Sequence, residues 1–140
     1  MNPDILSYIP QRPPFIMIGD VVKAEETITQ TTLTITGDNI FVKNGFFTEP
    51  GLIENMAQTA GAGTGYKSKK EGKPMPGGYI AALKNVQILE LPKTGDTILT
   101  ETVFLQTLLS FHLVSGKVMC GDREIASCEF KIFVHTDQTK

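Results

Sequence analysis

One acid and one amide stand out in the stretch FFTEPGLIENMAQTAGAGTGY, residues 46–66, which is otherwise apolar or built of very small residues. Glu54 and Gln58 are four residues apart, so they share one face of a helix. A carboxyl group buried without a partner stays protonated near neutral pH and can donate a proton to a leaving group. Gln58 can orient that acid, a substrate or a water molecule. The pair predicts acid catalysis, and the alternative is a solvent-facing or ion-paired Glu54 without a catalytic role.

The helix that carries this pair is predicted to span residues 48–66. Thr48 is a candidate N-cap, and Pro50 suits the first turn, where its missing N–H is tolerated. The run KSKKEGKPMPGG ends the helix. Nearly every direction around the helix is apolar or tiny, so we expect a sheet to bury it on all sides. Three glycines are expected to let the backbone of that curved sheet approach closely: Gly61, Gly63 and Gly65.

Strand patterns surround the helix. A short helical turn at residues 3–9 precedes an apolar strand at 15–22 and an alternating strand at 26–36. The alternating strand is expected to turn Ile28, Leu33 and Ile35 inward, with a bulge near residues 31–32. Turn dipeptides such as Gly95-Asp96 and Gly121-Asp122 separate the four strand candidates after the helix, which cover residues 79–89, 96–109, 110–120 and 123–136. The order predicts one α+β domain over residues 1–140, an antiparallel sheet around one long central helix.

Composition restricts the class of protein. The 140 residues are 41% hydrophobic and 20% charged, with a formal net charge of −2, so no basic face for nucleic acid is expected. The N-terminus lacks the features of a signal peptide, and no apolar run approaches the roughly 20 residues of a membrane helix. We therefore expect a cytoplasmic protein with no membrane or nucleic-acid partner. Cys120 and Cys128 are interpreted as small buried hydrophobes, and no metal, nucleotide or other cofactor is expected.

Four short motifs resemble hotdog-fold 3-hydroxyacyl-(acyl carrier protein) dehydratases: IPQRPPFIMIGDVV, GLIENMAQTAG, LPKTGDTI and GDREIASCEFKIFV. Glu54 and Gln58 match the family's Glu-x-x-x-Gln on the central helix. In this fold a sheet wraps one helix, and members usually form dimers whose sheets join edge to edge. The resemblance implies loss of water from a 3-hydroxyacyl carrier thioester, as in fatty acid biosynthesis. A histidine takes the α-proton, a carboxylic acid of the partner protomer protonates the leaving hydroxyl, and a backbone amide, here near Gly51, polarises the thioester carbonyl.

The chain departs from this family at the base. The family's histidine lies in a Gly-His-Phe-Pro motif before the helix, and Gly45 stands at that position in KNGFFTEPG. Neither Asn44 nor Gly45 can act as a base at neutral pH, and Gln11 replaces another common histidine. Phe46 and Phe47 are expected either to line the mouth of an acyl tunnel or to pack the helix start against the core. The candidate substrate-binding residues are Asn44, Gly45, Phe46, Phe47 and Gly51.

Neither histidine is expected to replace the missing base. If Phe111 and Leu113 face the core, strand alternation turns His112 outward, and His135 lies near the C-terminus. The lysines after the helix are interpreted as its solvated end, with contact to an acidic acyl carrier protein as the alternative. They are Lys67, Lys69, Lys70 and Lys73.

The run ENMAQTAGAGTGY is especially similar to histidine-lacking dehydratase subunits of aryl-polyene and flexirubin-type pigment clusters. Such subunits are accompanied by a second dehydratase that carries the histidine. The resemblance therefore implies that this chain supplies Glu54 to a heterodimer, although a homodimer stays open. Two other functions also stay open: a hotdog thioesterase in which Glu54 activates water, and a non-catalytic subunit that binds acyl carriers. The pantetheine arm of the carrier is the only prosthetic group that the resemblance implies.

Overall fold

The computed structural model describes residues 5–75 and 77–135. The described chain forms, in order, α1 (Ile5–Tyr8), β1 (Asp20–Ala24), β2 (Ile28–Thr34), β3 (Val42–Lys43), β4 (Phe46–Phe47), α2 (Glu49–Lys70), β5 (Gly77–Ile88), β6 (Thr97–Leu108), β7 (Phe111–Cys120) and β8 (Arg123–His135). The predicted order of a short helix, strands, one long helix and four further strands is confirmed. Residues 3 and 4 of the predicted first helix lie outside the described residues.

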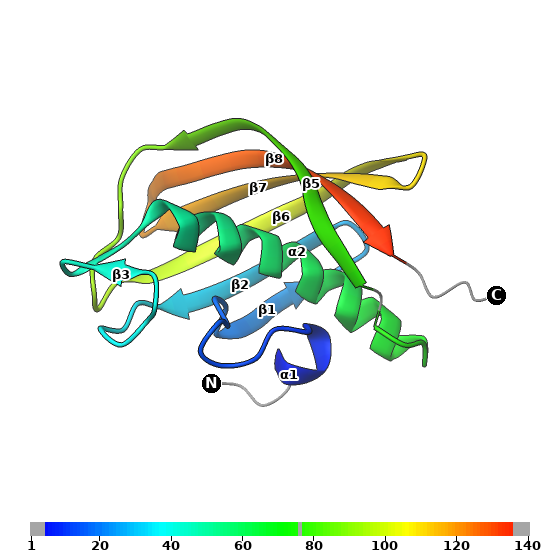
Figure 1. Cartoon of the computed structure of the whole chain (residues 1–140), viewed down its shortest axis with the longest axis horizontal. Coiled ribbons are helices and arrows are strands. Elements are labelled where there is room, and N and C mark those ends of the chain that lie inside the picture. Colours follow the sequence, from blue (N-terminus) through cyan, green and yellow to red (C-terminus); the bar gives the residue numbers. More distant parts are fainter. Residues whose placement is uncertain (1–4, 76, 136–140) are drawn as a thin grey trace.

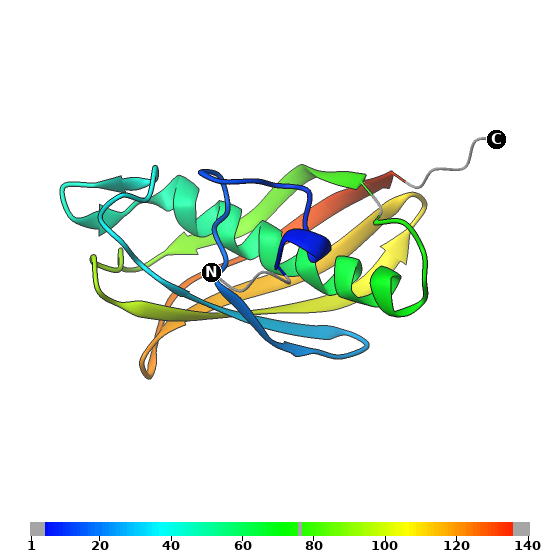
Figure 2. The ribbon, with the colours of Figure 1, turned by 90° about the horizontal axis from the view of Figure 1, so that it is seen from below.

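Within the described chain, six strands form one antiparallel sheet in the order β1-β2-β6-β7-β8-β5. The sheet curls, and α2 lies along its concave side (Figures 1 and 2). Strands β3 and β4 form a separate hairpin before α2. The predicted α+β architecture, an antiparallel sheet wrapped around one long helix, is therefore confirmed. Strands β1 and β5 are the two edges of the sheet.

The main core lies between α2 and the concave face of the sheet. At Gly116 of β7, an added Cβ atom would come within 3.1 Å of the sulfur of Met56, so this strand and the helix are in close contact. Fully buried apolar side chains each contribute about 1.5–3 kcal/mol relative to exposure. Those with 0% exposure include Leu52, Met56, Ile98, Val118, Ile125 and Phe130.

Helix α2 begins after Thr48, as predicted, and continues four residues beyond its predicted end. The Thr48 hydroxyl donates to the carbonyl of Phe41 at 2.7 Å and does not cap the helix. The prediction that α2 is buried on all sides is wrong for this chain, because the sheet covers only one side of the helix (Figure 2). Thr64 and Lys67 are exposed. No helix in the described chain is long and apolar enough to cross a membrane.

The three glycines of α2 have different surroundings. An added Cβ atom at Gly63 would lie 2.1 Å from the hydroxyl oxygen of Thr29 on β2, so this glycine does allow the sheet to approach. At Gly65 it would lie 1.8 Å from the carbonyl oxygen of Tyr8, which ends α1 and not a strand. At Gly61 it would meet nothing within 4 Å. The predicted role in sheet packing therefore holds for one glycine of the three.

The strand predicted at residues 15–22 begins only at Asp20. The backbone of Met17 is instead held by side chains of α2, those of Asn55 and Gln58, and the N–H of Gly19 already donates to Thr32 of β2. The bulge also lies elsewhere: the register shifts in β1 between Val21 and Lys23, and β2 itself is regular. The expected bulge in β2 follows only if Ile28 faces the core.

The core-facing residues of β2 alternate without interruption. Thr29 and Thr31 are 6% and 0% exposed, and Ile35 just beyond the strand is buried as predicted. Leu33 is partly buried and packs against the core. Ile28 has the opposite parity and therefore lies on the other face of the sheet, so its inward assignment is wrong. The concave face thus presents threonines to the helix.

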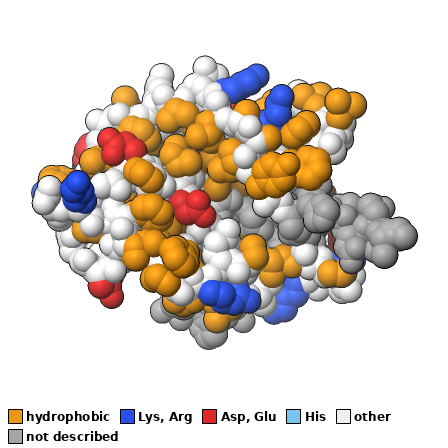
Figure 3. Space-filling view, viewed as in Figure 1, with side chains coloured by type: hydrophobic (Ala, Val, Ile, Leu, Met, Phe, Trp, Pro, Cys, Tyr) orange, Lys and Arg blue, Asp and Glu red, His pale blue; other side chains and the backbone are white. Residues whose placement is uncertain are grey.

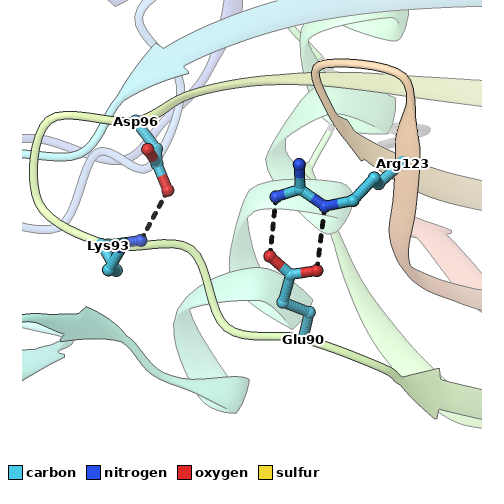
Figure 4. A network of polar contacts seen from close by, with 4 residues as sticks. All are labelled: Glu90, Lys93, Asp96 and Arg123. Carbon is cyan, nitrogen blue, oxygen red and sulfur yellow. Dashed lines mark hydrogen bonds and ion pairs between the residues drawn. The ribbon is translucent and has the colours of Figure 1, made fainter.

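The predicted turns are confirmed. Gly95 has a φ of 98°, and the N–H of Asp96 donates to the carbonyl of Lys93 at 2.9 Å. The N–H of Lys93 in turn donates to the Asp96 carboxylate (Figure 4). Close by, Arg123 donates two hydrogen bonds, of 3.1 and 2.7 Å, to the carboxylate of Glu90. This exposed pair connects the β5–β6 loop to the start of β8.

Both cysteines are free and buried. Cys120 pairs with Arg123 across the β7–β8 turn, and Cys128 lies opposite Gly116 in the same ladder. Burial raises the pKa of the Cys120 thiol and raises the pKa of the Cys128 thiol to about 12. Both therefore stay protonated at neutral pH, which confirms their interpretation as small buried hydrophobes.

Candidate active site

Glu54 and Gln58 lie on one flank of α2 and contact each other. The side-chain nitrogen of Gln58 donates to Oε2 of Glu54 at 2.8 Å. Gln58 is 2% exposed, whereas Glu54 is half-buried. The expectation of a fully buried Glu54 is therefore wrong for this chain, because the sheet lies on one side of the helix. The predicted contact between the acid and the amide is confirmed.

The orientation of the Gln58 amide is fixed by the backbone. The N–H of Met17 donates to Oε1 of Gln58 at 2.7 Å, so the amide nitrogen must face the other way. This nitrogen donates to the carbonyl of Phe15 at 2.9 Å and to Glu54. Because Oε2 of Glu54 accepts a hydrogen bond, the proton of a neutral Glu54 would lie on Oε1. No described residue forms a hydrogen bond with Oε1.

Asn55, next to Glu54 in the chain, completes the attachment of α2. Its side-chain nitrogen donates to the carbonyl of Met17 at 2.7 Å, and its side-chain oxygen accepts from the hydroxyl of Thr100 on β6. Thr59 donates to the backbone carbonyl of Asn55 and shares a 2.7 Å hydrogen bond with Thr31 on β2. These buried polar bonds fix the helix against two strands, which the sequence alone did not reveal. The signal was the polar pattern at residues 55, 58 and 59 within an apolar helix.

The segment before α2 forms a tight hairpin. Asn44 and Gly45 have φ values of 55° and 82°, the combination that the two central residues of a type I′ turn require. The carbonyl of Gly45 accepts a 3.0 Å hydrogen bond from the N–H of Thr94. Phe46 is 41% exposed, whereas Phe47 is fully buried in the core. The hairpin thus presents Phe46 outward while Phe47 packs beneath the start of α2.

Gly51 lies in the first turn of α2, one turn before Glu54. An added Cβ atom there would lie 2.6 Å from the ring of Phe47, so only glycine lets this ring pack against the helix. The Thr48 side chain does not cap the helix, and no described residue accepts a hydrogen bond from the N–H of Gly51. An unpaired N–H at the positive end of a helix dipole is suited to a carbonyl oxygen that gains negative charge.

A groove of about 470 Å³ lies beside the second half of α2. His112 lines this groove and is half-buried, with its ring edge-on to Phe104 at 5.2 Å between centroids. Val114, two residues on, is buried on the same face, so the predicted outward orientation of His112 is wrong. Burial lowers the pKa of His112. Glu54 is not among the groove residues, and no three His, Cys, Asp or Glu side chains in the described chain cluster as metal ligands do.

The lysines near the end of α2 are largely engaged. Lys67 forms a 3.0 Å ion pair with Glu26, and Lys73 forms a 3.4 Å pair with Glu71. The ammonium of Lys69 donates to the hydroxyl of Ser7. This arrangement agrees with the interpretation of the run as a solvated helix end.

Comparisons with known proteins agree with the motifs. The family described as ApeP-like, ApeP dehydratase, matches residues 3–140. The 3-hydroxyacyl-(acyl-carrier-protein) dehydratase FabZ of Fusobacterium nucleatum is 27% identical over 139 residues, which cover 94% of each chain.

Similar solved structures share the fold. A chain of the dehydratase heterocomplex ApeI:P from Xenorhabdus doucetiae superimposes with a TM-score of 0.85, at 16% identity, over 96% of this chain and 92% of that one. A hypothetical thioesterase from Streptococcus pneumoniae with coenzyme A has a TM-score of 0.65, at 12% identity, over 82% and 84%. The expected hotdog fold and dehydratase family are confirmed. The chain belongs to the ApeP-like dehydratase family.

Proposed function

We propose that this chain supplies the acid of a 3-hydroxyacyl-(acyl carrier protein) dehydratase whose active site is shared with a second hotdog chain. Glu54 is the proton donor, and Gln58 positions it. The observation that carries the proposal is the hydrogen bond from Gln58 to Oε2 of Glu54, which leaves Oε1 without a described partner. Family membership supports the reaction class.

The reaction requires an acid and a base on either side of one carbon–carbon bond. A base removes the proton from C2 of the thioester, and the electron pair forms the C2–C3 double bond as the C3–O bond breaks. Glu54 gives its proton to the departing hydroxyl, so water leaves and a 2-enoyl thioester forms. The N–H of Gly51 is proposed to stabilise charge on the thioester oxygen during this step. Phe46, in the hairpin with Asn44 and Gly45, would border the entrance, and Phe47 would support Gly51 from below.

The base is proposed to come from the partner. Among the side chains that the structure describes, His112 is the one histidine, and it lines the groove, to which Glu54 does not belong. Asn44 and Gly45 form the hairpin turn at the position of the family's histidine. A relative of this family forms a heterocomplex, the dehydratase ApeI:P. By analogy, the partner is a hotdog chain with a histidine in a Gly-His-Phe-Pro motif.

Strand β5 is suited to such a partner. It is one edge of the sheet, and its side chains Tyr79, Leu83 and Val86 are 62%, 42% and 44% exposed. An unpaired edge with exposed apolar side chains is a template for pairing with another strand. Figure 3 shows hydrophobic side chains over much of the face seen from the α2 side. These features support edge-to-edge joining with a second hotdog chain in the cytoplasm, where acyl carrier protein delivers the thioester.

The test combines the purified chain with a hotdog chain that carries the Gly-His-Phe-Pro motif, sought among the proteins encoded beside it. Formation of the enoyl thioester from a 3-hydroxyacyl carrier thioester is followed by absorbance. Replacing Glu54 by Gln keeps the size and removes the acid, so we expect a loss of roughly 100- to 10,000-fold in kcat. Glu49→Gln is the matched control, because Glu49 is an exposed acid of the same helix, and we expect wild-type activity. Full activity in Glu54→Gln would refute the proposal.

Two other results would favour a different function for this chain. Release of free thiol from acyl thioesters by this chain alone, dependent on Glu54, would indicate a thioesterase in which Glu54 activates water. Binding of the carrier without any effect of Glu54→Gln on turnover would indicate a non-catalytic subunit.

A further inference from the structure

The turn between β6 and β7 carries leucines on the surface of the molecule. Leu109 in the turn is 95% exposed, and Leu105 and Leu108 on β6 are 47% and 46% exposed. Figures 1 and 2 show this turn (yellow) at the end of the molecule where α2 also ends. Large apolar side chains that gather at one place on a surface mark a contact with another molecule or with a membrane.

The backbone of the turn does not favour leucine. Leu109 has a φ of 57°, in the left-handed region, which tight hairpin turns normally fill with Gly, Asn or Asp. Any of these three would also be more soluble than leucine at an exposed position. Folding therefore does not explain Leu109, and a role in binding does.

Apolar side chains continue from the turn across the outer face of the sheet. Leu108, Phe111, Phe133 and Tyr79 are register partners on four neighbouring strands. The ring centroids of Phe111 and Phe133 are 5.7 Å apart, and those of Phe133 and Tyr79 are 5.2 Å apart. Phe111 has the opposite parity to His112, which lies on the concave face, so this row lies on the convex face. The leucine turn thus borders a row of three aromatic rings.

Lysines lie at the same end of the molecule. The ammonium of Lys131 on β8 lies 5.3 Å from the ring centroid of Phe111. Lys69 and Lys70 in the last turn of α2 are exposed, and no carboxylate in the described chain forms an ion pair with either of them. Their charges remain available to an anionic surface.

This combination suits a lipid surface better than a protein. Protein interfaces depend mainly on Trp, Tyr and Arg, and leucine is under-represented among the residues that carry their binding energy. At a membrane surface, leucines enter the acyl region, aromatic rings lie at the boundary, and lysines reach the headgroups. Since no helix in the described chain is suited to crossing a membrane, the contact is with one leaflet.

We infer that the β6–β7 turn inserts Leu109 and its neighbouring leucines into the surface of an anionic membrane, with Lys69, Lys70 and Lys131 at the headgroups. The association is peripheral and reversible. The expectation of no membrane partner rests on the absence of a spanning segment, and this contact needs none. The inference is independent of the proposed function, because it uses neither Glu54 nor Gln58.

A fluorescent reporter tests the insertion. The chain contains no tryptophan, so Leu109→Trp places one reporter in the turn. The full chain is mixed with vesicles of phosphatidylcholine and phosphatidylglycerol. We expect the emission to shift to shorter wavelength and to be quenched by lipids brominated in their acyl chains. Leu89→Trp is the matched control, because Leu89 is 66% exposed and follows β5, which ends at the opposite end of the molecule (Figure 1); its emission should not change.

Cosedimentation with the same vesicles measures the strength of binding. Burial of one exposed leucine corresponds to roughly a 10- to 100-fold gain in partitioning, so Leu109→Asn should weaken binding at least tenfold. Asn is tolerated in the left-handed region, so the melting temperature should not fall. Leu89→Asn is the control and should bind as the wild type does. Combining Lys69→Gln with Lys70→Gln should weaken binding roughly fivefold per lysine, and only when phosphatidylglycerol is present.

Three results would overturn the inference. The first is a wild-type chain that does not sediment with anionic vesicles, and the second is equal binding by the wild type and Leu109→Asn. The third is a shift in the Leu109→Trp emission without vesicles, either on raising the protein concentration or on adding the hotdog partner. That shift would assign the turn to a contact with a second copy or with the partner.

Discussion

Replacing Gln58 by Met tests the arrangement around Glu54 most directly. Met has nearly the length of Gln and fits a buried position, but it loses three hydrogen bonds, to Met17, Phe15 and Glu54. Met17 is fully buried, so its N–H is left unpaired, at a cost of about 1–3 kcal/mol. Phe15 is exposed, and water can replace the bond to its carbonyl. With the lost bond to Glu54, we expect destabilisation of about 2–4 kcal/mol.

Urea denaturation measures this loss. With a slope of about 2 kcal/mol per M for a small domain, the midpoint falls by roughly 1–2 M. Gln106→Met is the control, because Gln106 is exposed on β6 and its side chain bonds to no described residue; we expect a change below about 0.5 kcal/mol. Identical midpoints for the two variants would mean that Gln58 does not hold Met17.

The same variant separates positioning from binding. In the complete dehydratase, Glu54 without its donor keeps its chemistry but loses its fixed orientation. We therefore expect kcat to fall with little change in KM. Because both residues act in one step, the double variant with Glu54→Gln should be no slower than Glu54→Gln alone. Additive losses would show that Gln58 acts independently of Glu54.

Two further predictions concern the groove end of the molecule. Gly65→Ala places a Cβ atom 1.8 Å from the Tyr8 carbonyl oxygen, so α1 must move and the melting temperature should drop by several degrees. Gly61→Ala is the control, because its Cβ atom meets open space, and its melting temperature should match or exceed that of the wild type. Equal melting temperatures for the two variants would contradict the packing of α1. Burial lowers the pKa of His112, so the unfolded chain binds its proton first and stability is lost as the pH falls through the ordinary histidine range. His112→Phe should flatten that loss, and NMR titration of the imidazole at or above its ordinary pKa would contradict the described burial.

The elements of the fold were predictable because their boundaries have strong local causes. Glycine–aspartate turns divide the last four strands. The glycines and prolines that follow Lys70 end the helix. Contact between Glu54 and Gln58 also follows from helical spacing alone. These features depend on residues close in the chain, which the sequence displays directly.

The orientation of strand residues was less predictable where both faces carry apolar side chains. In β2, Ile28 suggested one parity and Ile35 the other, and only contact with α2 decides between them. The deciding residues are Asn55 and Thr59, whose side chains are suited to a threonine face and not to an isoleucine face. The outward prediction for His112 is wrong for the same reason, because its neighbour Phe111, on the opposite face of β7, is the larger apolar residue. Such decisions depend on the partner across the sheet, which has no local signal.

The composition of α2 is explained by the different requirements along its length. A helix that only filled a core would carry large apolar residues at every inward position, yet here polar residues occupy the middle turns and glycine and alanine the following ones. Asn55 and Thr59 replace hydrophobic packing by hydrogen bonds to two strands, which fixes the rotation of the helix about its axis. That rotation decides whether the pair of Glu54 and Gln58 faces the open flank or the sheet. The small residues then keep the groove open on the same flank. Large apolar substitutions at Asn55 or Thr59 would therefore reorient the acid even if the core remained filled.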